Sequence, residues 1–382
     1  MATNNNNKAL NVPHLRFPEF TEEWETKPIN DLAVVIGGGT PDTTVKSYWD
    51  GKIQWFTPSE IGKTKYVDSS LRTITEDGLN NSSAKRLPPN TILLSSRATI
   101  GECSLSLREC ATNQGFQSLV SKKCNVDFLY YLIQTKKNDL IRKSCGSTFL
   151  EISANEVRKI QVSIPSDVEQ QKIAGLLSLI DERIATQNKI IERLETLIKG
   201  IRNEIFWKLR KNVGFNAIIG DVLDYEPPQS YIVEDTEYID KGTPVLTANK
   251  AFILGYTSET EGIYDKGDCI IFDDFTLDSK YVDFPFKVKS SAIKILTAEN
   301  KELLRYTFEF LKYLDLSTSE HKRHYIAETQ NQEFILPTTQ IVRTIAHTFS
   351  ILSLRMETAI KQRLLFEKQK TVSAPPDVYM NI

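Results

Sequence analysis

Apolar residues recur at alternating steps of four and three positions through the middle of this 382-residue chain. The series is Ile173, Leu177, Ile180, Ile184, Gln187, Ile191, Leu194, Ile198, Ile201 and Ile205, in which only Gln187 is polar. Heptad spacing is typical of a helix that wraps around a partner helix, and a lone polar residue in the seam can fix its register. Because no proline lies within 166–211, the pattern predicts one helix over these residues, about 70 Å long at about 1.5 Å per residue. A core helix of a large bundle is the alternative.

A second helix with the same register is predicted near the end of the chain, over 338–371. Aligning Pro165 with Pro337 gives an offset of 172 residues and superimposes the first seam on a second one without a gap. The second seam contains Ile345, Phe349, Leu352 and Met356. The partner of the first helix is therefore expected in the same chain, and the two seams predict a coiled coil.

The match between the helices extends upstream, so the chain contains an internal repeat with a long period. Paired segments follow one another in the same order in both copies: 53–61 with 243–251, 91–101 with 268–276, 113–120 with 290–296, 128–143 with 303–316, and 148–165 with 325–337. The repeat predicts a flexible lead-in over 1–13, a globular domain over 14–165, the first helix, a second globular domain over 212–337, the second helix, and a flexible tail over 372–382.

Composition is that of an ordinary soluble globular protein, with 40% hydrophobic and 25% charged residues. No apolar run is long enough to cross a bilayer, and the first residues show no apolar signal region. Cys103, Cys110, Cys124, Cys145 and Cys269 are odd in number, and none lies in a zinc-binding spacing. Reduced thiols and a cytoplasmic location are expected.

Charge is distributed unevenly along the chain, whose formal net charge is −2. Residues 1–165 carry a net +3, residues 166–211 +2, residues 212–337 −10 and residues 338–382 +3. An acidic second domain can bind DNA only if its basic residues gather on one face. The candidates for that face are Lys287, Lys289, Lys294, Lys322 and Arg323.

Motifs for catalysis are incomplete. The stretch IGKT at 61–64 has Thr57 where a phosphate-binding loop needs glycine, and GGG at 37–39 is not followed by a dinucleotide-binding pattern. The four histidines are not spaced as metal ligands, no NPPY-like or DPPY-like run is present, and Glu25-Thr26-Lys27 lacks the Pro-Asp of a nuclease site. We therefore predict a chain that is not itself an enzyme and holds no metal.

Two variable globular domains, each followed by a heptad helix introduced by "IP" or "LP", resemble the specificity subunit of type I restriction-modification enzymes. The resemblance runs from about His14 to Lys370, and its most specific stretches are PHLRFPEFTEEWETKPINDLA, EQQKIAGLLSLIDERI and TTQIVRTIAHTFS. It implies an α+β protein with two α/β target-recognition domains, separated by an antiparallel coiled coil and related by a pseudo-twofold repeat. The second domain departs from the pattern in being shorter and more acidic than the first.

The resemblance also implies partners. Each domain is expected to read one half of a bipartite double-stranded DNA target. The helices are expected to dock two methyltransferase subunits, which two motor nuclease subunits can join. S-adenosylmethionine, ATP and magnesium would then be bound by those partners and not by this chain.

Side chains suited to base edges and phosphates occur at predicted strand ends and on one helical stretch. In the first domain these are Ser95, Ser96, Arg97, Thr99, Asn113, Gln114, Lys136, Lys137, Arg142 and Lys143. In the second they are Thr247, Asn249, Lys250, Lys287, Lys289, Ser290, Ser291, Lys322 and Arg323. A solvated loop or helix face is the alternative for each group.

Two other classes of function remain open at this stage. A coiled-coil scaffold or regulator that binds proteins without reading DNA is favoured by the acidic second domain. A free-standing methyltransferase would need cofactor motifs that the sequence lacks. Dissimilar loops on duplicated domains favour recognition of two different DNA sequences.

Overall fold

The computed structural model describes residues 16–146, 150–248, 251–316 and 324–373. The chain divides into two compact units, unit 1 with residues 1–186 and 363–382, and unit 2 with residues 187–362. Both units contain helices and sheets, which confirms the predicted α+β class. Within the described ranges, none of the helices combines the length and the apolar character needed to span a membrane.

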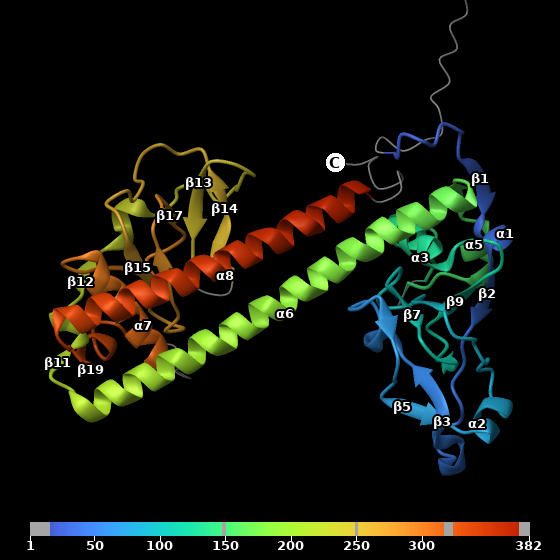
Figure 1. Cartoon of the computed structure of the whole chain (residues 1–382), viewed down its shortest axis with the longest axis horizontal. Coiled ribbons are helices and arrows are strands. Elements are labelled where there is room, and N and C mark those ends of the chain that lie inside the picture. The colour runs from blue at the N-terminus through green and yellow to red at the C-terminus, as the bar shows by residue number, and fades with distance from the viewer. Residues whose placement is uncertain (1–15, 147–149, 249–250, 317–323, 374–382) are drawn as a thin grey trace, which may run out of the picture. The chain divides into compact units, whose positions relative to one another are not determined.

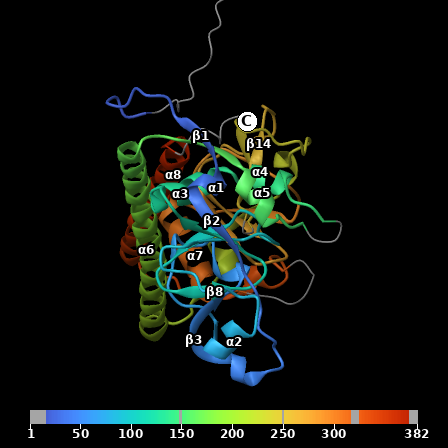
Figure 2. The same ribbon diagram turned by 90° about the vertical axis from the view of Figure 1, so that its right-hand side faces the viewer.

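Unit 1 is built on one five-stranded sheet, one three-stranded sheet and a two-stranded pair. Their strand orders are β2-β9-β6-β7-β4, β5-β3-β8 and β1-β10. The strands are β1 (Glu25–Pro28), β2 (Ala33–Gly37), β3 (Trp49–Phe56), β4 (Tyr66–Val67), β5 (Arg72–Ile74), β6 (Ile92–Leu94), β7 (Cys103–Ser106), β8 (Cys110–Thr112), β9 (Gln117–Ser121) and β10 (Gln161–Ile164). Figure 2 shows β3 together with helix α2 (Glu76–Asn80), at the end of the unit opposite β1.

Short helices complete unit 1. They are α1 (Ile29–Leu32), α3 (Val126–Thr135), α4 (Lys137–Arg142) and α5 (Ala154–Lys159). Residues 128–133 of α3 are apolar or aromatic, and all of them are buried. The main core of the unit joins α3 to β2, β6, β7 and β9.

Unit 2 has the same types of sheet in a shorter chain. Its strand orders are β12-β18-β15-β16, β14-β13-β17 and β11-β19. The strands are β11 (Ala217–Ile218), β12 (Asp224–Glu226), β13 (Thr243–Leu246), β14 (Ile253–Thr257), β15 (Cys269–Asp273), β16 (Ser279–Val282), β17 (Lys287–Val288), β18 (Ile293–Thr297) and β19 (Glu333–Phe334). Helix α7 (Lys301–Leu314) packs its apolar face on β15 and β16.

The two units share one topology, which confirms the internal repeat. The order β5-β3-β8 corresponds to β14-β13-β17, with a parallel pair between β3 and β8 and between β13 and β17. The order β2-β9-β6-β7 corresponds to β12-β18-β15-β16, and β4 is an extra edge strand of unit 1. Even the helix caps correspond, because Asn125 caps α3 and Asn300 caps α7 through the amide three residues on, each at 2.9 Å.

Two long helices, α6 (Asp167–Asn212) and α8 (Thr339–Ser373), begin within one residue of the predicted starts. Figure 1 draws α6 in green and α8 in orange to red. They are antiparallel in unit 1, where Lys370 pairs with Asp181 at 2.7 Å and Arg183 lies over the ring of Phe366. In unit 2 the guanidinium of Arg202 lies over Phe349.

The heptad seam also packs against the domains and not only against the other helix. Ile173 and Leu177 are buried in the core of unit 1. Ile198, Ile201, Ile205 and Leu352 pack against the core of unit 2, to which Ile345 and Phe349 belong. Ile180 and Gln187 are buried, whereas Ile184, Ile191, Leu194 and Met356 are half-buried. The division between the two compact units falls within α6 and α8.

A buried charge cluster ties both long helices to α7 in unit 2. Glu309 on α7 accepts from Arg202 of α6 at 2.7 Å and from Arg305 at 2.9 Å. Arg305 also donates to the carbonyl of Phe349 on α8, at 3.2 Å. The Glu309 side chain is 2% exposed, so both guanidinium groups depend on it for charge balance.

We expect Glu309→Ala to lower the free energy of unfolding of unit 2 by roughly 3–5 kcal/mol, because it leaves two guanidinium groups without their buried carboxylate. Urea unfolding followed by circular dichroism measures the change. Glu204→Ala is the matched control, since Glu204 forms an exposed pair with Lys208 on α6 and little change is expected. Equal unfolding midpoints for Glu309→Ala and the wild type would contradict the prediction.

Candidate nucleic-acid interface

Some of the residues predicted to read DNA in unit 1 lie on loops that meet at one place. The loop after β6 is fixed by backbone hydrogen bonds: the amide of Ser96 donates to the carbonyl of Gly115 at 2.8 Å, and the carbonyl of Ser96 accepts from Ile152 at 3.1 Å. Isolated bridges join Ser95 to Phe116 and Arg97 to Glu151. Three segments distant in sequence are therefore held together, as expected for a recognition surface on a rigid scaffold.

The first two residues of this loop and the residues at its tip differ in exposure. Ser95 and Ser96 are buried, so their hydroxyl groups cannot contact DNA, and these two residues leave the candidate set as a correction to the sequence prediction. Arg97 and Thr99 are exposed at the tip, on either side of Ala98, which has a φ of 56°. Side chains adopt this left-handed backbone rarely, so the surrounding hydrogen bonds hold the loop in a defined shape.

Carboxylates accompany the basic groups around the loop. Arg97 pairs with Glu151 at 2.7 Å, and Lys137 pairs with Glu102 at 2.5 Å. Arg142 pairs with Asp139, one turn away on α4. Lys143 is exposed, whereas Lys136 is buried and lies 3.8 Å from Asp139, so its ammonium is withdrawn from the surface.

A second polar loop joins β8 to β9. Gln114 is exposed and accepts a hydrogen bond from Thr40, while the side chain of Asn113 accepts from the amide of Gly115 at 2.9 Å. Gly38 and Gly39 make this approach possible, because a Cβ at Gly38 would lie 1.9 Å from the carbonyl oxygen of Asn113. Gly38 and Gly39 thus serve the close packing of these loops.

Two of the basic candidates in unit 2 are buried, which corrects the sequence prediction for them. Lys287 is buried and pairs with Glu259 at 2.5 Å while donating to the carbonyl of Glu261. Lys294 is also buried and pairs with Asp274 at 3.2 Å. Both ammonium groups balance internal carboxylates, so the expected basic face of unit 2 cannot include them.

Other candidates of unit 2 lie at the end of β13 and in the loop after β17. Lys289 is exposed, Ser290 and Ser291 are half-buried, and Thr247 is buried. The amide of Lys289 donates to the carbonyl of Leu246, which places the loop after β17 beside the end of β13. Asn249, Lys250, Lys322 and Arg323 lie outside the described residues.

Sequence reasoning missed one exposed side chain in this region. Phe275 follows β15 and is 39% exposed, beside the exposed Thr276. The alignment of 91–101 with 268–276 places Phe275 in the loop of unit 2 that corresponds to the loop of Arg97 in unit 1. That alignment was the signal that could have identified Phe275.

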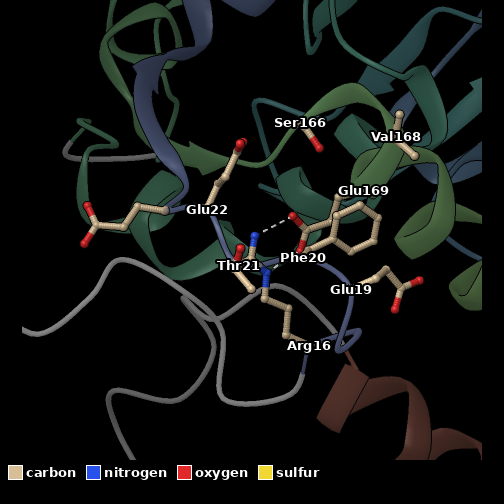
Figure 3. Close-up of a pocket in the computed structure, with 9 residues that line it drawn as sticks. Arg16, Glu19, Phe20, Thr21, Glu22, Ser166, Val168 and Glu169 are labelled. Atoms are coloured by element: carbon tan, nitrogen blue, oxygen red, sulfur yellow. Dashed lines mark hydrogen bonds and ion pairs between the residues drawn. The ribbon is translucent and has the colours of Figure 1, made fainter.

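A pocket of about 310 Å³ lies at the start of α6, away from these loops. Figure 3 shows Arg16 reaching the carboxylate of Glu169, to which it donates two hydrogen bonds of 2.7 Å. Trp24 donates to the same carboxylate at 3.3 Å. The buried Glu169 raises the pKa of Arg16 above its ordinary value. The cluster anchors the segment before β1 to α6, a structural role that the sequence did not reveal.

Chemistry-bearing side chains are otherwise dispersed. In the part of the chain that the structure describes, no group of three His, Cys, Asp or Glu side chains is arranged to hold a metal ion. The five cysteines are free thiols, and burial raises the pKa of Cys103 to about 12. Cys145 is exposed, and its backbone forms an isolated β-bridge with Glu151 beside the loop of Arg97 in unit 1.

The chain thus combines duplicated α/β units with two long helices and with polar loops at matching strand ends. Comparison with known proteins then identifies similar chains. Residues 21–196 match the family described as the type I restriction modification DNA specificity domain. Over these residues the chain is similar to members of that family.

Named relatives agree with this family. The MjaIX specificity subunit of a type I restriction enzyme from Methanocaldococcus jannaschii is 36% identical over 221 residues, which are 56% of this chain and 51% of the relative. The EcoR124I/EcoR124II specificity subunit from Escherichia coli is 42% identical over 151 residues, 38% of this chain and 35% of the relative. The chain thus spans about half or less of the length of these relatives.

The fold likeness covers almost the whole chain. The crystal structure of a type I restriction-modification S subunit from M. genitalium matches with a TM-score of 0.65 at 15% identity, over 97% of this chain and 100% of that one. A structure from work on the complex assembly of a type I R-M system matches with a TM-score of 0.52 at 13% identity, over 94% and 98%. At such identities the likeness concerns the fold, which extends through unit 2.

Proposed function

We propose that this chain is the sequence-specific DNA-binding subunit of a type I restriction-modification complex, in which each unit reads one half of a bipartite duplex target. The observation that carries the proposal is one topology used twice, with loops at the same strand ends that differ in chemistry. A duplicated scaffold with different exposed tips suits the reading of two different half-sites.

The long helices are proposed to dock the methyltransferase subunits, with motor nuclease subunits joining the assembly. Support comes from large apolar side chains that α6 and α8 leave exposed, although both helices already pack in a seam. Examples are Leu179, Ile190, Leu197 and Trp207 on α6, and Leu354, Leu364 and Leu365 on α8. Exposed apolar side chains mark a protein-binding surface where they form a contiguous patch.

DNA binding is tested by measuring affinity for the target duplex and for random duplex across a range of salt concentrations, with and without the methyltransferase subunit. The proposal expects the complex to prefer one bipartite sequence, which methylome sequencing of a host that gains both subunits identifies. Affinity for random duplex falls with salt because phosphate contacts release counterions. A partner-bound chain without sequence preference would instead support the scaffold alternative, which the net −10 of residues 212–337 favours.

Catalysis is proposed to reside in the partners, which would bind S-adenosylmethionine, ATP and magnesium. We therefore expect the purified chain alone neither to transfer labelled methyl groups to target duplex nor to cut it. Adding the methyltransferase subunit is the positive control and should produce methylation. Methyl transfer by the chain alone, retained through repeated purification, would overturn this prediction.

A further inference from the structure

The loops that follow β6 in unit 1 and β15 in unit 2 are built on the same backbone frame. The amide of Ser96 donates to Gly115 and the amide of Asp274 donates to Ala292, at 2.8 and 2.9 Å. The carbonyl of Ser96 accepts from Ile152, and the carbonyl of Asp274 accepts from His324, at 3.1 and 3.2 Å.

The closing bonds of the two loops correspond as well. In unit 1 the carbonyl of Ser95 accepts from Gly101 at 3.1 Å, and in unit 2 the carbonyl of Asp273 accepts from Leu277 at 2.9 Å. Four hydrogen bonds thus have counterparts, since the amides of Ser95 and Asp273 also both close their loops, onto Glu102 and Asp278. Arg97 and Phe275 therefore occupy equivalent positions, because each lies two residues after the first residue of its loop, Ser95 or Asp273.

In both loops the first two residues are buried and the tip is exposed. Arg97 is 44% exposed and Phe275 is 39% exposed, while the two residues before each of them are buried. The frame leaves these two side chains as the point where the loops differ most in chemistry. An equivalent position filled by arginine in one unit and phenylalanine in the other distinguishes between two kinds of DNA contact.

Phosphate contacts select for positive charge, and a phenylalanine ring offers none. Base edges in the major groove accept both side chains, because arginine donates two hydrogen bonds to guanine O6 and N7 and phenylalanine contacts the methyl group of thymine. The pair Arg97–Glu151 leaves the guanidinium half-exposed, held by one carboxylate and free to donate from its outer edge.

We propose that Arg97 and Phe275 are equivalent specificity-determining residues of the two units, Arg97 reading a guanine in one half-site and Phe275 a thymine in the other. The proposal rests on the function proposed above and deepens it by assigning one base pair in each half-site to one side chain.

The test measures methylation by the complex with its methyltransferase subunit, on duplexes in which each target base pair is varied in turn. We expect Arg97→Ala to reduce discrimination at one guanine of one half-site by about tenfold or more. The other half-site should stay unchanged. Arg97→Lys should show a similar loss, because lysine keeps the charge and lacks the guanidinium fork. Phe275→Ala should relax one thymine of the opposite half-site.

Matched controls come from the same units. Arg108 is an exposed arginine held by Asp68 at 2.6 Å, and Ile239 is an exposed apolar residue of unit 2. Arg108→Ala and Ile239→Ala should leave discrimination at every base pair unchanged. Circular dichroism melting is expected to be unchanged for all variants, since each replaced side chain lies at the surface.

The outcomes separate the inference from the function on which it rests. A wild-type complex without sequence preference would refute the proposed function itself. A sequence-specific wild type whose Arg97→Ala and Phe275→Ala variants keep full discrimination would overturn the inference alone. A uniform loss of affinity across sequences, restored by Arg97→Lys, would show a phosphate contact and would also overturn it.

Discussion

Replacing residues 216–335 with the corresponding segment of another specificity subunit is expected to change one half of the methylated sequence and leave the other half as it was. The physical reason is that the segment contains the sheets of unit 2 and the loops proposed to meet DNA. Methylome sequencing of cells that carry the exchanged chain and its methyltransferase subunit measures both halves at once.

The structure makes the two junctions of this exchange compatible. The segment begins with β11 and ends with β19, and these two strands pair with each other, Ala217 opposite Phe334 and Ile218 opposite Glu333. Asn216 then closes the junction, because its side chain donates to the carbonyl of Leu336 at 3.0 Å and accepts from the amide of Leu336 at 2.8 Å. The segment therefore leaves and rejoins the scaffold at one place, so the donor should keep asparagine at position 216.

The exchanged segment must also fit the long helices. Phe310 of α7 packs against Phe206 of α6, and Glu309 pairs with Arg202. A donor segment with phenylalanine at position 310 and glutamate at position 309 is expected to fold. A donor segment without the glutamate is the control, because it shows the result expected when the exchanged chain misfolds. A folded, partner-bound exchange protein in which both half-sites change would show that the units do not read DNA independently.

The heptad pattern was sufficient to predict both long helices, because apolar periodicity reports which face of a helix is covered. Their starts were correct to one residue, since a proline precedes each helix. The predicted seam residues lie on α6 and α8, but only some of their packing partners were predicted. Ile173 and Leu177 are as apolar as the rest of the seam, so the sequence could not show that a domain core covers them.

Candidate DNA contacts were harder to predict, for a physical reason that Lys287 illustrates. A lysine in the sequence indicates positive charge but not whether a carboxylate from another strand neutralises it. Glu259 does so across the fold, and Asp274 does the same for Lys294. Burial of Ser95 and Ser96 is likewise a tertiary effect, because their loop turns back between two others. The internal alignment puts Phe275 in the loop that corresponds to the loop of Arg97, but the hydrogen bonds that make the two positions equivalent exist only in the folded chain.

Lengthening both α6 and α8 by one heptad is expected to move the two half-sites apart on DNA. The seam repeats every seven residues, so one added heptad in each helix preserves its register, which here includes Gln187 and the half-buried Ile191 and Leu194. A heptad adds about 10 Å at about 1.5 Å per residue. A heptad added to α6 alone is the control, because it puts the two seams out of register and should weaken their pairing.

If the helix pair sets the distance between the domains, the preferred spacer should grow by about three base pairs, or somewhat fewer where the helices do not lie parallel to the DNA, because the duplex advances about 3.4 Å per base pair. The half-site sequences should stay the same, since no loop of either unit is altered. Methylation of duplexes that differ only in spacer length measures the preference. If a folded variant that binds the methyltransferase subunit still prefers the original spacer, then α6 and α8 only dock partners, and the spacing is set by how those partners hold the DNA.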